Sequence, residues 1–381
     1  MCVRMLEQLC EELMYKYSLA TAFILSSASV AISGGFELQT LDTSAMYESG
    51  GYASLSTANL NSKLNGVGAD GKKVKTLKDQ SFSNFSVKGD IAGISIGLVT
   101  YRSGAIQMSG DSDATFAGSY APSVNANIDT IALLAKYKVD ESFDLIGGIK
   151  QNNLSAFNLT SIYGSYDINS KSNNSYVLGG AYSIPEIALR AELLVQPASK
   201  MSTAGSFAGS ALVGNAPGTV SANIKQPEMV TLNFQTGIAA NTLLRASVHQ
   251  AKWGSAQVNA DVTTGSAVVD ASAAVASEFG DSTKYTIGVG RKFSKNLSGS
   301  ISYNQEAGGG STSTSSFTMS NGSKAVSAGL QYSLENMNIS LGVSHTMFND
   351  VTVQPTTPGV PALSYTGNSA TTFGVKVAFA F

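Results

Sequence analysis

Strict alternation of large apolar residues with small or polar ones is the dominant pattern along the chain. It is clearest in the last segment, where large apolar side chains occupy every second position: Phe373, Val375, Val377, Phe379 and Phe381. Segments beginning at Ile131, Ile187 and Val230 repeat it. A period of two indicates β-strands with one large apolar face. The chain is therefore predicted to be all-β.

Short and long connections alternate between these segments. Tight turns are predicted at 88–90, 139–142, 183–186, 239–242, 294–296 and 334–336, and long loops at 61–79, 103–125, 166–174, 202–223, 262–281, 307–322 and 352–368. Six turns and seven loops join fourteen strands. Outer-membrane barrels have an even number of strands, apolar outer faces, short periplasmic turns and long extracellular loops. The pattern thus predicts a transmembrane antiparallel β-barrel of about 14 strands in a Gram-negative outer membrane.

The two ends of the chain fit an exported barrel. Residues 15–25 and the small residues before Gly34 have the n-region, apolar core and cleavage site of a signal peptide. We therefore interpret 1–33 as an N-terminal extension and signal peptide, with Met14 as the true start; a single membrane anchor is the alternative. A terminal Phe is usual in outer-membrane barrels, so Phe381 is expected to engage the barrel-assembly machinery.

Composition excludes several classes of protein. Only 13% of the 381 residues are charged, against about 25% in a soluble domain. The 24 basic and 26 acidic residues give no basic field, so no nucleic-acid partner is expected. Outer-membrane lipid and lipopolysaccharide are the expected surroundings. The near-neutral balance also argues against a charge-selective pore.

Little in the sequence resembles an active site. Both cysteines, Cys2 and Cys10, lie in the extension, so the mature chain has no thiol for a zinc site or disulfide, and no cofactor or metal is expected. The Gly-x-Ser-x-Gly match at 93–97 sits in an alternating strand without the helix of a nucleophile elbow. His249 is expected to be a structural lumen residue. We predict that the protein is not an enzyme.

Alternation also places several charged residues on the lumen face. Arg190, Arg245 and Lys376 are the best candidates to hold the carboxylate of an amphipathic ligand. A lumen ion-pair network that braces the barrel is the competing interpretation.

One long loop, 202–223, is apolar and carries no charge. Exposed apolar patches usually mark binding surfaces or contacts with neighbouring loops. We predict that the loop captures a hydrophobic ligand through Phe207, Leu212, Val213 and Val220.

Several segments resemble the FadL family of outer-membrane long-chain fatty acid transporters. The similarity lies in Pro227–Gly237, followed by 246–248 and 253–255, and in 182–190 and 285–293, the last two being similar to a compact alphaproteobacterial branch. It is clearest over 175–381.

The resemblance implies a fourteen-stranded barrel with an N-terminal hatch, an extracellular apolar groove and a lateral opening in the wall. The hatch would be short, residues 34–48, followed by the barrel at 49–381. The family's Asn-Pro-Ala segment is missing, with only Ser56–Asn59 near its place, which puts the same gating in doubt.

The expected function is passive outer-membrane transport of hydrophobic compounds, most specifically long-chain fatty acids. A general diffusion porin, a structural or adhesive barrel and a lipase-like enzyme are the alternatives.

Overall fold

The computed structural model describes residues 35–68, 71, 73–110, 122–264, 277–308, 310–354 and 362–381. The predicted extension and signal peptide, with Met14, lie outside this part of the chain. Within it, no helix is both long and apolar enough to cross a membrane.

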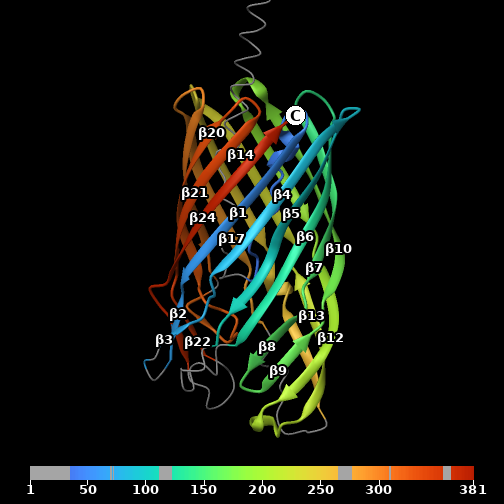
Figure 1. The fold of residues 1–381 in the computed structure, drawn as a ribbon, viewed down its shortest axis with the longest axis vertical. Coiled ribbons are helices and arrows are strands. Elements are labelled where there is room, and N and C mark those ends of the chain that lie inside the picture. Colours follow the sequence, from blue (N-terminus) through green and yellow to red (C-terminus); the bar gives the residue numbers. More distant parts are fainter. Residues whose placement is uncertain are drawn as a thin grey trace, which may run out of the picture.

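The described residues form a closed antiparallel barrel of fourteen strands, as predicted (Figure 1). Its strands are β1 (Tyr52–Lys63), β4 (Gln80–Ile91), β5 (Ile94–Met108), β6 (Ser123–Lys138), β7 (Phe143–Leu154), β10 (Lys171–Ile184), β11 (Leu189–Gln196), β14 (Met229–Ala239), β15 (Thr242–Ala251), β17 (Ser282–Lys292), β18 (Leu297–Ala307), β20 (Gly322–Ser333), β21 (Met337–Phe348) and β24 (Ser369–Ala380). The first and last strands pair from Tyr52↔Ala380 to Lys63↔Ser369 and close the barrel. Closure satisfies the backbone groups that a membrane leaves without water.

The apolar face of each strand points outward. Phe373, Leu133 and Ile301 are all more than half exposed, whereas inward neighbours such as Thr372 and Ser302 are buried. Aromatic side chains are exposed beside the short turns, among them Tyr137, Tyr182, Phe293 and Tyr332. Such a surface fits lipid rather than water. The protein is a transmembrane β-barrel of the outer-membrane type.

Five of the six predicted tight turns lie where strands reverse, and the first is wrong. Lys88 and Asp90 belong to β4, and the chain turns at Ala92 and Gly93 instead. Both turn residues have positive φ, 50° and 81°. Two-residue hairpins favour this conformation because it matches the twist of the strands, and Gly93 accepts it without strain. Gly89 is an ordinary strand residue.

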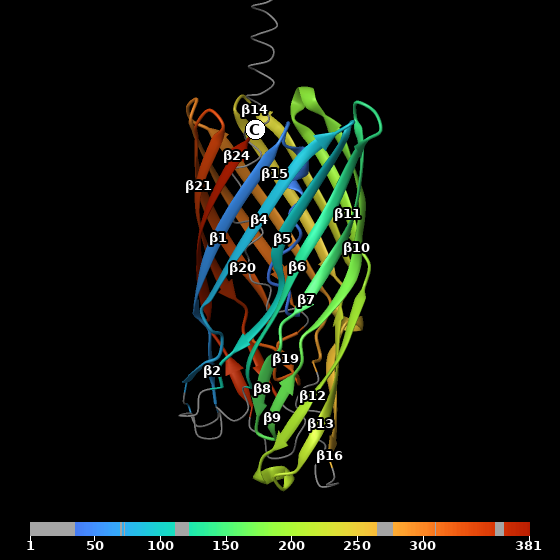
Figure 2. The ribbon, with the colours of Figure 1, turned by 45° about the vertical axis from the view of Figure 1, so that its right-hand side comes forward.

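At the end opposite the short turns, the sheet continues beyond the barrel through β8 (Phe157–Ser161), β9 (Gly164–Ile168), β12 (Ser199–Gly209), β13 (Pro217–Gln226) and β16 (Val258–Thr264) (Figure 2). A separate small sheet contains β2 (Asn65–Val67), β3 (Lys73–Lys75), β19 (Thr312–Ser313), β22 (Val351–Val353) and β23 (Leu363–Tyr365). Long loops mark this end as extracellular.

Two predicted loops are therefore wrong in detail. The connection predicted at 166–174 runs from Ser155 to Ser170 and contains a hairpin, since β10 already begins at Lys171. Residues 202–223 form much of the hairpin of β12 and β13, with η4 (Ala211–Val213) at its tip. Both segments lack the large apolar outer face because they project past the membrane, so the alternation that predicts strands fades there.

The chain before β1 lies inside the barrel. Residues from Phe36 to Ala45 line the lumen cavities, and the short 3₁₀ helix η2 (Ser44–Tyr47) buries Ala45 and Met46 against the inner wall. The first strand of the barrel begins at Tyr52. This N-terminal segment, residues 35–48, fills part of the lumen and positions the site. Three more 3₁₀ turns belong to other parts of the chain: η3 (Pro185–Ile187), η4 and η5 (Trp253–Ser255).

Candidate functional site

An apolar cavity of about 50 Å³ lies in the extracellular half, closed on one side by Phe36 of the N-terminal segment. The strands β5, β6, β13 and β16 supply small and branched side chains to its wall, including Ala126, Ala222 and Ala260. None of its solvent-accessible lining is polar. The cavity can therefore bind an apolar group but offers no polar partner to a charged one.

Three aromatic rings pack beside this cavity. Phe36 lies 4.7 Å from the ring of Trp253 and 5.9 Å from that of Phe279, measured between centroids. Gly35 approaches Trp253 so closely that a Cβ there would lie 2.2 Å from the indole. Only glycine fits at that position, so the contact fixes the start of the described N-terminal segment against the wall.

The wall is interrupted next to this segment. The β4–β5 ladder runs from Ile91↔Ile94 only to Phe85↔Thr100, although both strands continue. A β-bulge between Arg102 and Gly104 bends β5 at the point where the pairing stops. The seam between residues 80–84 and 101–107 is thus left without a regular ladder.

The N-terminal segment takes the strand edge that β4 leaves free. The amide of Leu38 donates to the carbonyl of Ser103 at 3.1 Å, and the amide of Ala105 donates to the carbonyl of Phe36 at 2.9 Å. Among the described residues, the side-chain oxygens of Gln80 and Asn84, buried on the β4 side, have no partner. Arg102 of β5 still donates to the Ser81 carbonyl of β4 at 3.4 Å, but the regular backbone pairing of β5 in this part of the seam is with the N-terminal segment.

A buried contact between Glu37 and His249 ties the same segment to another part of the wall. Glu37 Oε2 lies 2.9 Å from His249 Nε2 on β15, and both side chains are less than 10% exposed. Thr231 Oγ1 lies 2.8 Å from His249 Nδ1 and holds the ring in place. His249 is a lumen residue, as predicted, and its contacts are structural.

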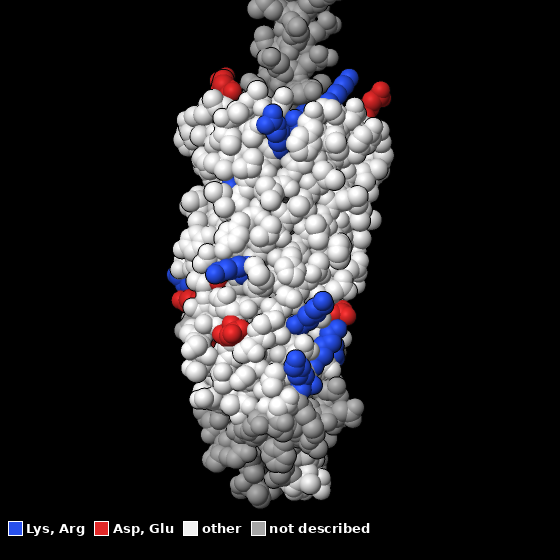
Figure 3. All heavy atoms as spheres, turned by 90° about the vertical axis from the view of Figure 1, so that its left-hand side faces the viewer, with Lys and Arg blue, Asp and Glu red and all other residues white. Residues whose placement is uncertain are grey.

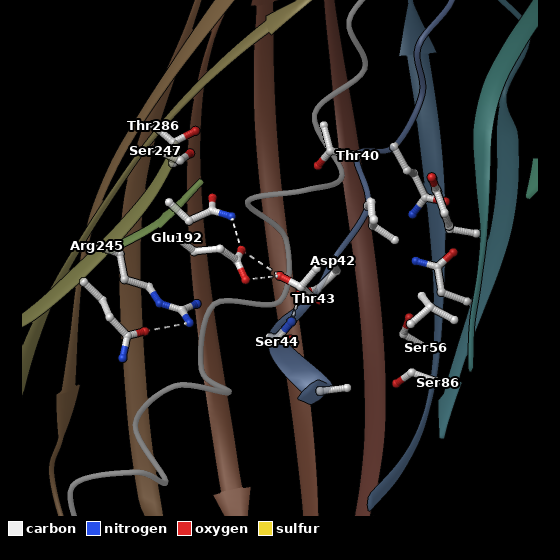
Figure 4. Close-up of a pocket in the computed structure, with 18 of the residues that line it drawn as sticks. Thr40, Asp42, Thr43, Ser44, Ser56, Ser86, Glu192, Arg245, Ser247 and Thr286 are labelled. Carbon is white, nitrogen blue, oxygen red and sulfur yellow. Dashed lines mark hydrogen bonds between the residues drawn. The ribbon is translucent and has the colours of Figure 1, made fainter. Parts of the chain in front are cut away.

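A larger, polar cavity of about 190 Å³ lies deeper in the lumen (Figure 4). Residues 39–45 run along it. A small cavity of about 20 Å³ shares Gln39 and Tyr101 with it and is also lined by Glu37. Glu192 accepts hydrogen bonds from Thr43 at 2.7 Å, Tyr47 at 2.6 Å and Asn233 at 2.9 Å. This carboxylate anchors the lower half of the N-terminal segment.

The three cations predicted to hold a ligand carboxylate all line this polar cavity. Arg190 and Arg245 donate to the same Gln235 Oε1, at 3.3 and 3.2 Å, from adjacent parts of the wall. The guanidinium of Arg190 also stacks over the Tyr47 ring at 3.7 Å. Lys376 reaches the cavity from β24. The structure brings the three together; their role toward a ligand stays a prediction.

Carboxylates of the N-terminal segment face these cations. Burial raises the pKa of Asp42, but the positive charge of Lys376, hydrogen bonds from Ser44 and the charge of Arg245 together lower it below its ordinary value. Burial instead dominates at Glu48 and raises its pKa, despite the neighbouring cations. Asp42 is exposed to the cavity and is the natural competitor of an incoming carboxylate.

The predicted capture residues lie in the β12–β13 hairpin. Phe207, Val213 and Val220 are buried within the hairpin cluster, where Phe207 packs on Tyr166 at 4.9 Å between ring centroids. The side chain of Leu212 lies outside the described part of the chain. This cluster is continuous with the side chains of the apolar cavity, which it supports from behind.

The sequence did not predict two features of the site: the apolar cavity, and the pairing of residues 36–39 with the edge of β5. A Ser-Gly pair in the middle of an alternating strand, at 103–104, is the one signal that indicates the bulge. Among the described residues, no cluster of histidine, cysteine or carboxylate side chains could hold a metal ion.

A closed barrel with an apolar outer face and a lumen partly filled by its own N-terminal segment defines the class of outer-membrane β-barrels with an internal plug. The fold is that of solved FadL-type channels. A Pseudomonas aeruginosa FadL homologue superposes with a TM-score of 0.75 at 11% identity, over 95% of this chain and all of that one. The Pseudomonas putida toluene transporter TodX gives 0.65 at 12% identity, covering 93% and 97%. The Ralstonia pickettii toluene transporter TbuX gives 0.64 at 12% identity, covering 94% and 97%.

No family model matches the sequence, and no curated protein sequence matches it either. The likeness therefore lies in the fold, including the predicted fourteen strands.

Proposed function

We propose that the protein is a passive channel that carries hydrophobic compounds from the cell exterior into the outer membrane. The observation that carries this proposal is the series of cavities along one segment. Phe36 closes the apolar cavity, Glu37 and Gln39 line the small one, and residues 39–45 line the polar one. A ligand that moves inward must displace this segment.

The seam between β4 and β5 supports the proposal that the ligand leaves the lumen sideways, through the barrel wall. The polar cavity is lined both by Arg190, deep in the lumen, and by Phe85, whose side chain lies on the outer face. The cavity thus reaches the wall where the β4–β5 ladder stops. An apolar ligand gains free energy by entering lipid there instead of crossing into water.

Long-chain fatty acids are the first candidate ligand class. The acyl chain would occupy the apolar cavity while it passes, and Arg190, Arg245 and Lys376 would then hold the carboxylate in the polar cavity in place of Asp42. Neutral hydrocarbons, such as the toluene named for two of the structural relatives, are the second candidate. The wholly apolar lining of the upper cavity favours them.

Alanine substitution of the three cations separates these ligand classes. We expect Arg190→Ala, Arg245→Ala and Lys376→Ala each to weaken oleate binding about tenfold, the value of one charge-assisted hydrogen bond. Toluene binding should be unchanged, because it carries no charge. The fluorescence of Trp253, the only tryptophan, reports both titrations. Unchanged oleate affinity in all three variants would reject the carboxylate role and leave neutral hydrocarbons as the ligand.

Filling the seam tests the exit separately from binding. Asn84→Phe is expected to slow oleate delivery into liposome membranes at least tenfold while Trp253 still responds to the ligand. Asn84 lines the polar cavity at the seam, and its side-chain oxygen has no partner among the described residues, so replacement loses no hydrogen bond to that atom. Asn84→Ala, which leaves the seam empty, is the control. Normal delivery through the Phe variant would place the exit elsewhere.

A further inference from the structure

The outer face of the barrel carries a hollow that is separate from the lumen cavities. It has a volume of about 610 Å³ and crosses β17, β18, β20, β21 and β24. Its size is within the range of pockets that hold small ligands. Half-buried Val289 and the exposed apolar side chains of Phe293, Ile301, Leu330, Leu341, Val343 and Phe373 surround it. A barrel wall packed only against mobile lipid needs no such depression.

Two small residues make the hollow. Gly299 and Ala328 occupy outward positions where neighbouring strands carry large side chains, since Gly299 pairs with Leu330 and Ala328 with Ile301. Phe293 packs over Gly299, where a Cβ would lie 2.7 Å from the phenyl ring. The ring therefore forms the wall of the hollow at the end that bears the short turns.

One cation borders this apolar surface. Arg291 is exposed on the outer face of β17, beside Gly299 in the register. Its guanidinium makes no hydrogen bond or ion pair with any other residue of the described chain. Few charged side chains show on this face between the charges near the short turns and those of the extracellular half (Figure 3). An unpaired guanidinium at the edge of a lipid-facing surface can extend to the interface, where anionic headgroups are within its reach.

We propose that this hollow binds one phospholipid of the periplasmic leaflet. Its acyl chain lies in the hollow over Gly299 and Ala328, and its phosphate is held by Arg291. Arginine suits this contact because its planar fork matches the geometry of phosphate oxygens. The short turns place Arg291 at the periplasmic interface, where the lipid phosphates lie. The occupant is therefore a phospholipid rather than lipopolysaccharide or cargo from outside.

Native mass spectrometry of the detergent-purified protein tests the site. Titration with dioleoylphosphatidylglycerol is expected to give one tightly retained lipid on the unmodified chain. Arg291→Gln should weaken its retention about tenfold, as expected for the loss of one charge-assisted hydrogen bond. Ala328→Leu should weaken it to a similar degree by filling the hollow. Heat-modifiable electrophoretic mobility confirms that each variant is folded.

Two matched variants make the result specific. Ala135→Leu adds the same side chain to the outer face of β6, and Lys324→Gln removes an exposed cation from the outer face of β20. Neither should change lipid retention. Equal retention by all folded variants, or equal losses in the controls, would show ordinary annular lipid and overturn the proposal. Displacement of the lipid by oleate would also overturn it, because the hollow would then belong to the transported ligand.

Discussion

Ala260→Phe is expected to abolish the response of Trp253 to oleate and toluene and to slow uptake of both at least about a hundredfold. Ala260 is 4% exposed and lines the apolar cavity, so an added phenyl ring would occupy the space that a ligand has to enter. A ligand that buries about 200 Å² of apolar surface there gains about 5 kcal/mol of binding free energy. In the variant, the phenyl ring takes that space and the ligand loses this contribution.

Uptake into liposomes and quenching of Trp253 provide the two measurements. Ala135→Phe adds the same ring to the exposed outer face of β6 and should leave both unchanged. Overpacking at Ala260 costs about 1–3 kcal/mol, which a closed barrel tolerates, and electrophoretic mobility reports folding. A folded Ala260→Phe protein with normal uptake would mean that ligands bypass the apolar cavity.

The barrel itself follows from local sequence patterns. Alternation identifies the outer face of β24 because lipid demands large apolar side chains at every second position, and the turns at 139–142 and 334–336 are marked by short polar interruptions. The same rule places Arg190, Arg245 and Lys376 in the lumen. It fails beyond the membrane, where neither face meets lipid, and so the hairpins of the extracellular extension resemble plain loops.

The contents of the lumen cannot be deduced in this way. Residues 36–39 can pair with β5 because the β4–β5 ladder ends early. Where that ladder ends depends on both strands, so neither strand's sequence predicts it alone. The cavity depends on the contact of Gly35 and Phe36 with Trp253, which lies more than 200 positions further along the chain. In the sequence, small residues such as Ala126 and Ala222 look like ordinary strand positions. Only the folded structure shows that they line the apolar cavity.

In the proposed channel, this edge pairing would let a short segment both close the lumen and be released. The backbone of Leu38 and Phe36 pairs with β5 at the seam, so we expect movement of this segment to open the lumen and the wall together. A net contribution of about 1 kcal/mol per backbone hydrogen bond makes these two contacts weak. The buried contact of Glu37 with His249 is therefore the main restraint in this part of the segment.

Glu37→Ala is consequently expected to release the N-terminal segment. Removing Glu37 leaves the buried Nε2 of His249 without its partner, which costs about 1–3 kcal/mol, at least as much as either backbone bond contributes. Phe36 and Gly35 would leave the Trp253 ring, so its emission should shift to the red. Single-channel conductance in planar bilayers should rise from near zero to a frequent open state.

Two variants define what the Glu37→Ala result means. Glu228→Ala breaks an exposed ion pair with Lys252, next to Trp253 in the chain, and should change neither readout because exposed pairs contribute little. Combining Glu37→Gln with His249→Gln replaces the charged contact by an amide pair of similar shape and should restore most of the closed state. If Glu37→Ala leaves emission and conductance as they are, the contact with His249 does not hold the segment, and the Glu192 contacts of the lower half must close the channel alone.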